Sequence, residues 1–158
     1  MFLDARSFYV KVLKLKSAYW NEGAKYRWEY MSAVIDILKI MGAESICEAG
    51  ASGIPLNDKS FLMDYPQYDL DKPLPEFDKF FDCFVALQVW EHLKNPIEAF
   101  RQVMKISRAA ILSFPYKWKH GDKQHNNIDE NVISKWTCGI KPVFTKLIKD
   151  RIIYVWRF

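Results

Sequence analysis

The sequence predicts a single α/β domain with a Rossmann-like, mostly parallel sheet that is sandwiched by helices and follows an N-terminal helical segment. Short apolar runs alternate with helical patterns along the chain, and this alternation is typical of βαβ units. The apolar runs contain few charges, as expected for strands that are buried on both faces. The length of 158 residues, with 50% hydrophobic and 27% charged residues, suits one domain with one sizeable core.

Residues 1–43 are predicted to form N-terminal helices. An amphipathic pattern begins with Phe8 and Val12 and continues through Leu15 and Tyr19. A longer helix follows, and Gly42 stands where a C-terminal cap is expected. Its apolar face consists of Met31, Val34, Ile35, Leu38 and Met41.

Residues 44–116 are predicted to form the core of the sheet. Strands are expected over 44–50, 60–64, 81–87 and 109–114, and Pro115 ends the last of them. Asn95 and Pro96 begin a helix that runs to about Ile106, because Asn is a good N-cap and Pro suits the first helical position.

Residues 117–158 are predicted to form a loop or lid followed by C-terminal strands. The segment 117–127 is polar and loop-like, a helix is expected over 129–136, and the alternation over 151–158 predicts a final strand.

The charge pattern limits the classes of partner. The net charge of +4 is too small for a dedicated nucleic-acid binder. The basic stretches are either solvated faces or a rim that attracts an anionic substrate. The sequence contains no run of about 18 apolar residues, so no membrane span is predicted. The N-terminus lacks a signal-peptide core, and we therefore expect a cytoplasmic protein.

Four motifs stand where strands of the predicted sheet end, which is where ligands bind in parallel sheets. They read E-A-G-A-S-G over 48–53, D-L-D-K-P-L-P over 69–75, F-D-C-F-V-A-L-Q-V-W-E-H-L-K-N-P over 81–96 and I-L-S-F-P over 111–115. In this order they resemble the class I S-adenosylmethionine-dependent methyltransferases. The closest likeness is to the small type 11 branch that contains the methionine-biosynthesis MetW proteins.

The resemblance implies S-adenosylmethionine as the cofactor and a role for each matching residue. Glu48 matches the acid that orders the amino-acid end of the cofactor. The turn beneath the cofactor consists of Gly50, Ala51, Ser52 and Gly53. Asp64 matches the ribose ligand, Asp69 with Leu70 the adenine site, and Leu87 with Gln88 the methionine site.

One departure from the family pattern concerns the interval between Gly50 and Asp69. A regular member needs two helices and two strands there, which takes roughly 40 residues or more. The sheet is therefore predicted to be reduced around its second and third strands. In such a short interval Asp64 and Asp69 could share one strand and turn, so either of them could hold the ribose.

The resemblance places Glu91 and His92 on the substrate side of the cofactor. Histidine titrates near neutrality, so His92 is the candidate general base, with a structural role as the alternative. Tyr116, Trp118 and His120 are candidate substrate contacts if the loop 117–127 acts as a lid. The histidines and aspartates of this loop match no metal-ligand spacing, and no metal site is predicted.

The predicted activity is methyl transfer to a small-molecule or saccharide acceptor. The alternative is a non-catalytic, methyltransferase-like binding module with a degraded cofactor site. Nucleic-acid methylation is disfavoured, because the chain has Ser113-Phe-Pro-Tyr116 at the last parallel strand in place of an N/D-P-P-Y/F signature.

Overall fold

The computed structural model describes every residue except 79 and 120–122. The helices are α1 (Ala5–Leu15), α2 (Ala18–Asn21), α3 (Ala24–Met41), α4 (Pro96–Ile106) and α5 (Glu130–Trp136), with 3₁₀ turns η1 (Trp90–His92) and η2 (Lys123–His125). The strands are β1 (Ile46–Ala49), β2 (Phe61–Met63), β3 (Cys83–Leu87), β4 (Ala109–Pro115), β5 (Phe144–Ile148) and β6 (Arg151–Arg157).

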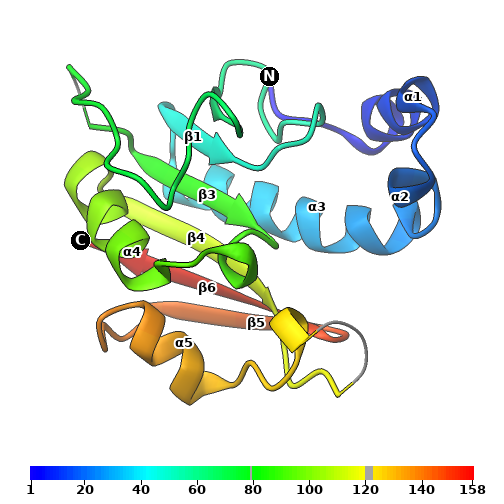
Figure 1. The fold of residues 1–158 in the computed structure, drawn as a ribbon. Helices are drawn as coiled ribbons and strands as arrows, with labels where there is room; N and C mark the ends of the chain where they lie inside the picture. Colours follow the sequence, from blue (N-terminus) through cyan, green and yellow to red (C-terminus); the bar gives the residue numbers. More distant parts are fainter. Residues whose placement is uncertain (79, 120–122) are drawn as a thin grey trace.

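These strands form one sheet in the order β2-β1-β3-β4-β6-β5 (Figure 1). The strands β1, β2, β3 and β4 are parallel, and β6 runs antiparallel to both of its neighbours, β4 and β5. The chain leaves β1 toward β2 on one side and then returns to β3 on the other side. The topological switch point therefore lies between the carboxyl ends of β1 and β3, where open α/β sheets bind ligands.

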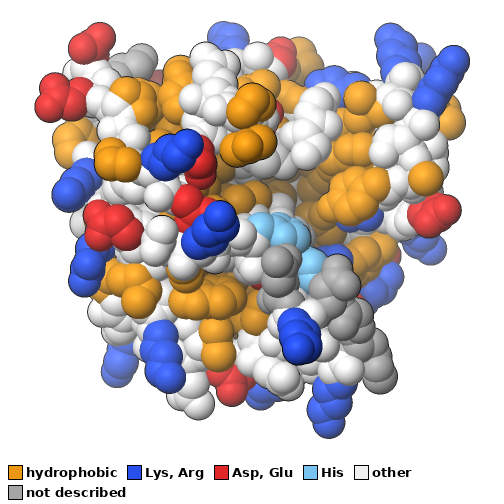
Figure 2. Space-filling view, in the orientation of Figure 1, with side chains coloured by type: hydrophobic (Ala, Val, Ile, Leu, Met, Phe, Trp, Pro, Cys, Tyr) orange, Lys and Arg blue, Asp and Glu red, His pale blue; other side chains and the backbone are white. Residues whose placement is uncertain are grey.

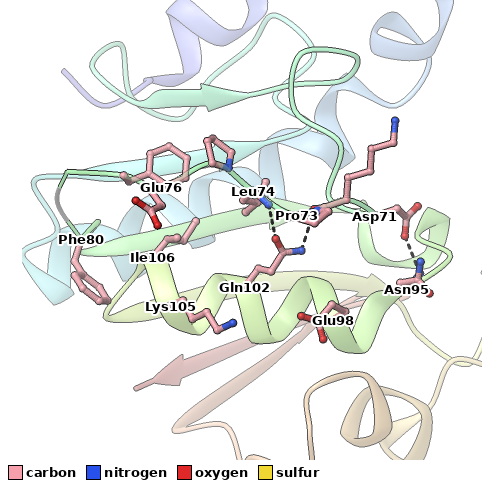
Figure 3. Close-up of a pocket in the computed structure, with 13 residues that line it drawn as sticks. Asp71, Pro73, Leu74, Glu76, Phe80, Asn95, Glu98, Gln102, Lys105 and Ile106 are labelled. Carbon is pink, nitrogen blue, oxygen red and sulfur yellow. Dashed lines mark hydrogen bonds between the residues drawn. The ribbon is translucent and has the colours of Figure 1, made fainter.

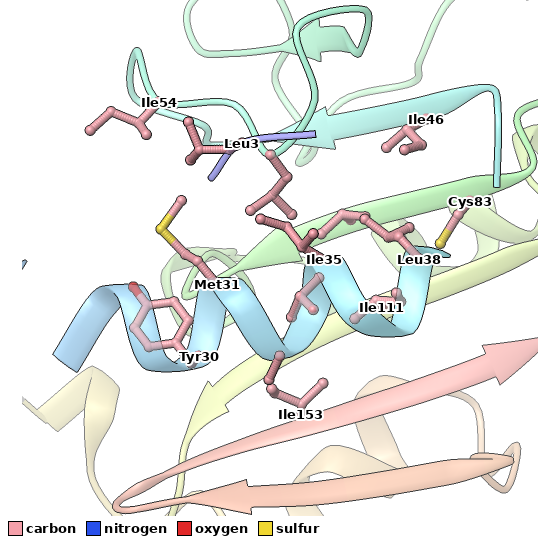
Figure 4. Packing of buried hydrophobic residues seen from close by; sticks show 14 of the residues in the cluster. Leu3, Tyr30, Met31, Ile35, Leu38, Ile46, Ile54, Cys83, Ile111 and Ile153 are labelled. Carbon is pink, nitrogen blue, oxygen red and sulfur yellow. The ribbon is translucent and has the colours of Figure 1, made fainter. Parts of the chain in front are cut away.

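Helices cover both faces of the sheet. Figure 1 shows α3 behind the sheet and α4 and α5 in front of it. Successive strand residues alternate between the two cores: Val85 packs on the α3 side, whereas Phe84 and Ala86 pack against α4. Figure 4 shows how Met31, Ile35 and Leu38 of α3 meet the strand side chains, as their helical spacing predicts.

The predicted fold class is confirmed, including the reduced part of the sheet. A loop without a helix joins β1 to β2, and the described residues between β2 and β3 contain no helix either. One short strand thus stands where a regular fold of this kind has two. The helix α4 begins at Pro96 as predicted, but the Asn95 side chain makes no capping bond. The backbone N–H of Asn95 donates to Asp71 Oδ1 at 2.7 Å.

Among the described residues, no helix combines the length and apolar character needed to cross a membrane.

Candidate functional site

A cleft of about 630 Å³ opens at the switch point, beyond the carboxyl ends of β1 and β3. Such a volume is typical of small-molecule sites. Figure 2 shows a hollow on this face of the molecule, with histidine side chains beside it. The cleft is lined by several of the residues that the motifs single out: Gly50, Ser52, Asp69, Leu70, Leu87, Gln88 and His92.

The turn after β1 packs tightly against the turn after β3. Gly50 has a φ of +73°, and a Cβ there would lie 2.6 Å from Cγ2 of Val89. Gly53, with a φ of +84°, is the second left-handed glycine of this turn. A side chain at position 50 would push the two turns apart, so this glycine is what allows them to form a single wall of the cleft.

Glu48 lies beneath the turn rather than in the cleft. It is 4% exposed, and its carboxylate accepts the N–H of Leu56 with both oxygens, at 3.0 and 2.8 Å, and the N–H of Asn57 at 3.2 Å. Burial raises the pKa of Glu48, while these backbone bonds pull the pKa down. In this structure the carboxylate holds the loop that replaces the missing helix.

The two aspartates that compete for the ribose role have different surroundings. Asp64 accepts the N–H of Ala51 at 3.0 Å and so closes the glycine turn, and it does not line the cleft. Asp69 does line the cleft, and its carboxylate accepts the N–H of Asp71 at 3.0 Å and lies 3.4 Å from Lys72 Nζ. The geometry therefore favours Asp69 as the residue that can reach a ligand.

Gln88 is fixed by residues from the other half of the sheet. Its amide donates to Ser113 Oγ at 2.9 Å and accepts a hydrogen bond from the Arg151 guanidinium. Arg151 also lies over the ring of Trp118, at 4.6 Å from the centroid. Sequence reasoning missed Arg151, because only the antiparallel pairing of β6 with β4 brings it to the end of β3.

Glu91 and His92 occupy η1, directly after β3, and His125 of η2 lies beside them. Glu91 is 6% exposed, and within the described part of the chain neither of its carboxylate oxygens has a hydrogen-bond partner. Burial raises its pKa to about 7, and the backbone N–H of Glu91 and then the charge of Arg151 oppose this rise. The rings of His92 and His125 have centroids 4.9 Å apart.

The two predicted lid residues that the structure describes, Tyr116 and Trp118, form hydrogen bonds outside the cleft. The Tyr116 hydroxyl donates to Glu130, and the Trp118 indole N–H donates to the carbonyl of Asp150 at 2.9 Å. Neither residue lines the cleft, although Trp118 stacks on His125 with ring centroids 5.9 Å apart. His120, the third candidate substrate contact, lies outside the described residues.

A second cavity of about 610 Å³ lies between α4 and the segment that begins at Asp71 (Figure 3). The side-chain amide of Gln102 on α4 links the helix to the opposite wall of this cavity. It accepts the N–H of Leu74 at 2.5 Å and donates to the carbonyl of Lys72 at 3.1 Å. None of the site residues predicted from the motifs lines this cavity. The cleft at the switch point is therefore the stronger candidate.

No protein-family model and no curated protein matches the chain. Solved structures do match. A methyltransferase from Clostridium acetobutylicum that depends on S-adenosylmethionine is 10% identical over 95% of this chain and 96% of its own, with a TM-score of 0.62. Magnesium protoporphyrin IX methyltransferase from Synechocystis, solved with bound S-adenosylmethionine, is 17% identical over 84% and 80%, with a TM-score of 0.56.

A third match is the N-terminal domain of EvdMO1, solved in the presence of S-adenosylhomocysteine and D-fucose. It is 13% identical over 82% of this chain and 81% of its own, with a TM-score of 0.53. Identities this low establish the architecture alone. The chain has the fold of the class I S-adenosylmethionine-dependent methyltransferases.

Proposed function

We propose that the chain is an S-adenosylmethionine-dependent methyltransferase that acts on a small-molecule or saccharide acceptor. The observation that carries the proposal is the cleft at the switch point, because the fold family and the residue motifs lead independently to the same place. Its volume suits a small molecule, and one structural neighbour was crystallised with a sugar and the demethylated cofactor.

The residues around the cleft fit this cofactor. The glycine turn at 50–53 brings backbone close to a ligand, Asp69 offers a carboxylate to adenine or ribose, and Leu70 and Leu87 offer apolar walls. Gln88, held by Ser113 and Arg151, presents a fixed polar edge toward the methionine end. When bound, the cofactor supplies a methyl group on a sulfonium, and the protein binds and orients it.

His92 is the residue that we propose as the proton acceptor. It lines the cleft and is exposed, so an acceptor hydroxyl can reach its imidazole. General-base catalysis of this kind is worth about 10²- to 10⁴-fold in rate.

The alternative is a binding module without activity. Its support is the reduced connection between β1 and β3, together with Asp64 and Glu48 being engaged by backbone N–H groups rather than facing the cleft. A weakened cofactor site would leave the fold intact, because these bonds hold the loop without any ligand.

Calorimetric titration with S-adenosylmethionine and S-adenosylhomocysteine tests the proposal. We expect binding to wild type and equally to Glu98→Ala, a variant in the wall of the second cavity. A dissociation constant above about 1 mM for both compounds, which corresponds to about −4 kcal/mol, would favour the inactive module. If wild type binds and Glu98→Ala does not, the cofactor binds in the second cavity and not in the cleft at the switch point.

Activity is then tested by transfer of a labelled methyl group to a panel of saccharides and small hydroxylated acceptors. For any acceptor found, His92→Gln is expected to lower kcat by about 10²-fold or more while S-adenosylhomocysteine still binds. Unchanged kcat in this variant would exclude His92 as the base.

A further inference from the structure

Three ligating side chains converge at the rim of the cleft from two separate elements. Glu91 and His92 belong to η1 after β3, and His125 belongs to η2 in the segment after β4. One carboxylate oxygen of Glu91 and one nitrogen of each imidazole all lie within 4.8 Å of one another. Two imidazoles and a carboxylate form a donor set that suits divalent transition metals.

The carboxylate of Glu91 needs a partner that the described chain does not provide. Both of its oxygens are buried and lack a hydrogen-bond partner among the described residues. The nearby cation, Arg151, donates through Nη1 to Gln88 and packs over Trp118. It makes no hydrogen bond to Glu91, although its Nε also lacks a partner among the described residues. A buried carboxylate without a partner is costly, and such groups are normally paired or coordinate a metal.

We propose that Glu91, His92 and His125 form a binding site for one divalent transition-metal ion of the zinc class. At tetrahedral angles, bonds of about 2.0–2.2 Å to such an ion place two ligand atoms about 3.3–3.6 Å apart. The three ligand atoms lie within 4.8 Å of one another here, so some of them must approach by up to about 1.3 Å. The His92 ring is exposed and the His125 ring is half-buried, and we expect their rotation toward the buried carboxylate to supply this approach.

The ion would tie two parts of the chain together and leave coordination positions open. It would join η1, at the end of β3, to η2, which lies far along the sequence. Three protein ligands leave room for water or for an oxygen of a bound molecule, as in catalytic zinc sites. His92 also lines the cleft, so we expect an open coordination position to be accessible from there.

The role of the ion in the reaction rests on the proposed function. A nitrogen that ligates a metal cannot accept a proton, so in the metal-bound state His92 holds the ion. An acceptor hydroxyl bound to the ion would then release its proton to solvent water more readily, because the metal lowers its pKa. Metal binding itself does not depend on this role.

The test uses protein that has been freed of metal with a chelator and then dialysed. Zn²⁺ is titrated in by calorimetry, and Co²⁺ is titrated with detection of its visible absorption. We expect one ion per chain and a higher melting temperature, because the ion links η1 to η2. Glu91→Gln and His125→Gln are each expected to weaken Zn²⁺ binding at least tenfold.

Two control variants locate the ion. Glu98→Gln, an exposed carboxylate on α4, and Cys138→Ser, an exposed thiol, should bind Zn²⁺ as wild type does. Absence of binding, unchanged binding in His125→Gln, or loss of binding in Cys138→Ser would each overturn the proposal. His125→Gln keeps the test decisive if the buried Glu91→Gln variant does not fold.

Titration of the same samples with S-adenosylhomocysteine separates the two proposals. Protein that binds this compound but no metal overturns the metal site and leaves the proposed function intact. Protein that binds metal but neither S-adenosylmethionine nor S-adenosylhomocysteine overturns the proposed function and leaves the metal site intact.

Discussion

Two buried carboxylates follow neighbouring strands of this sheet and differ in what surrounds them. Glu48 ends β1 at 4% exposure, and Glu91 follows β3 at 6% exposure. Glu48 accepts hydrogen bonds from two backbone N–H groups of the loop before β2. Glu91 has no hydrogen-bond partner among the described residues. The two side chains are similarly buried but differ in role. Glu48 holds the backbone of a loop, whereas Glu91 is the carboxylate for which we propose a metal ion as the partner.

The electrostatic consequence follows from the partners. Backbone N–H groups stabilise the charged form of a carboxylate, and they partly oppose the effect of burial on the pKa of Glu48. At Glu91 burial outweighs the opposing effects of its own backbone N–H and of Arg151, and its pKa rises to about 7. Without a bound cation, Glu91 is thus neutral in mildly acidic solution and becomes charged only near neutrality.

The largest expected effect is that of removing Glu48. Glu48→Ala leaves the N–H groups of Leu56 and Asn57 without an acceptor, and each unsatisfied group costs about 1–3 kcal/mol. We expect a loss of about 4 kcal/mol in the free energy of unfolding, measured in urea, and about half of that for Glu48→Gln, which keeps one acceptor oxygen. A change close to zero in Glu48→Ala would show that the loop is held by other contacts.

The second prediction concerns Glu91, whose charged form destabilises the folded protein, in contrast to the stabilising carboxylate of Glu48. A folded-state pKa of about 7 against an ordinary 4.5 means that the folded protein binds a proton that the unfolded chain has already lost. The contribution of Glu91 to stability is therefore greatest below pH 4.5, falls as the pH rises toward 7 and is constant above it, a total loss of about 3 kcal/mol.

Glu91→Gln removes this titration while keeping the shape of the side chain. In the presence of a chelator, we expect the variant to be more stable than wild type by about 3 kcal/mol at pH 8 and equally stable at pH 4. Urea unfolding at both pH values measures the difference, with the exposed Glu98→Gln as the matched control. If the two proteins differ by the same amount at both pH values, Glu91 does not titrate as described.

The contrast between the carboxylates shows what the sequence can and cannot predict. Phe84 and Val85 lie in an apolar run that marks a buried strand, and Pro96 marks the start of a helix, so β3 and α4 are predicted from local patterns. The strand β5 was not located, because its residues are mostly exposed and show no buried face to produce an alternation.

The candidate site was predictable only where one segment supplies it. Gly50 and His92 follow strand ends in the sequence, and the structure places both in the cleft wall. Arg151 and His125 reach the same region through the antiparallel return of β6 and the path of the loop after β4. No spacing in the sequence encodes such contacts, because they depend on tertiary structure.

A third prediction concerns the contact that joins the two regions. Gly50→Ala places a Cβ against Val89 at a left-handed φ, which we expect to cost about 2 kcal/mol. Combining it with Val89→Ala relieves the clash, so the double variant should be about 1 kcal/mol more stable than the sum of the single changes predicts. Additive effects in urea unfolding would show that the two turns do not press on each other.

The smallest expected effect separates Asp64 from Asp69, which the motifs alone leave as alternatives for the ribose. Asp64 closes the glycine turn through the N–H of Ala51, whereas Asp69 lines the cleft. Asp69→Asn should therefore weaken S-adenosylhomocysteine binding about tenfold, or about 1.4 kcal/mol, with little change in stability. Asp64→Asn keeps an acceptor oxygen and should change the affinity less than Asp69→Asn does. Calorimetric titration of both variants measures this difference, and a larger loss of affinity in Asp64→Asn would mean that the cofactor displaces the turn to reach that carboxylate.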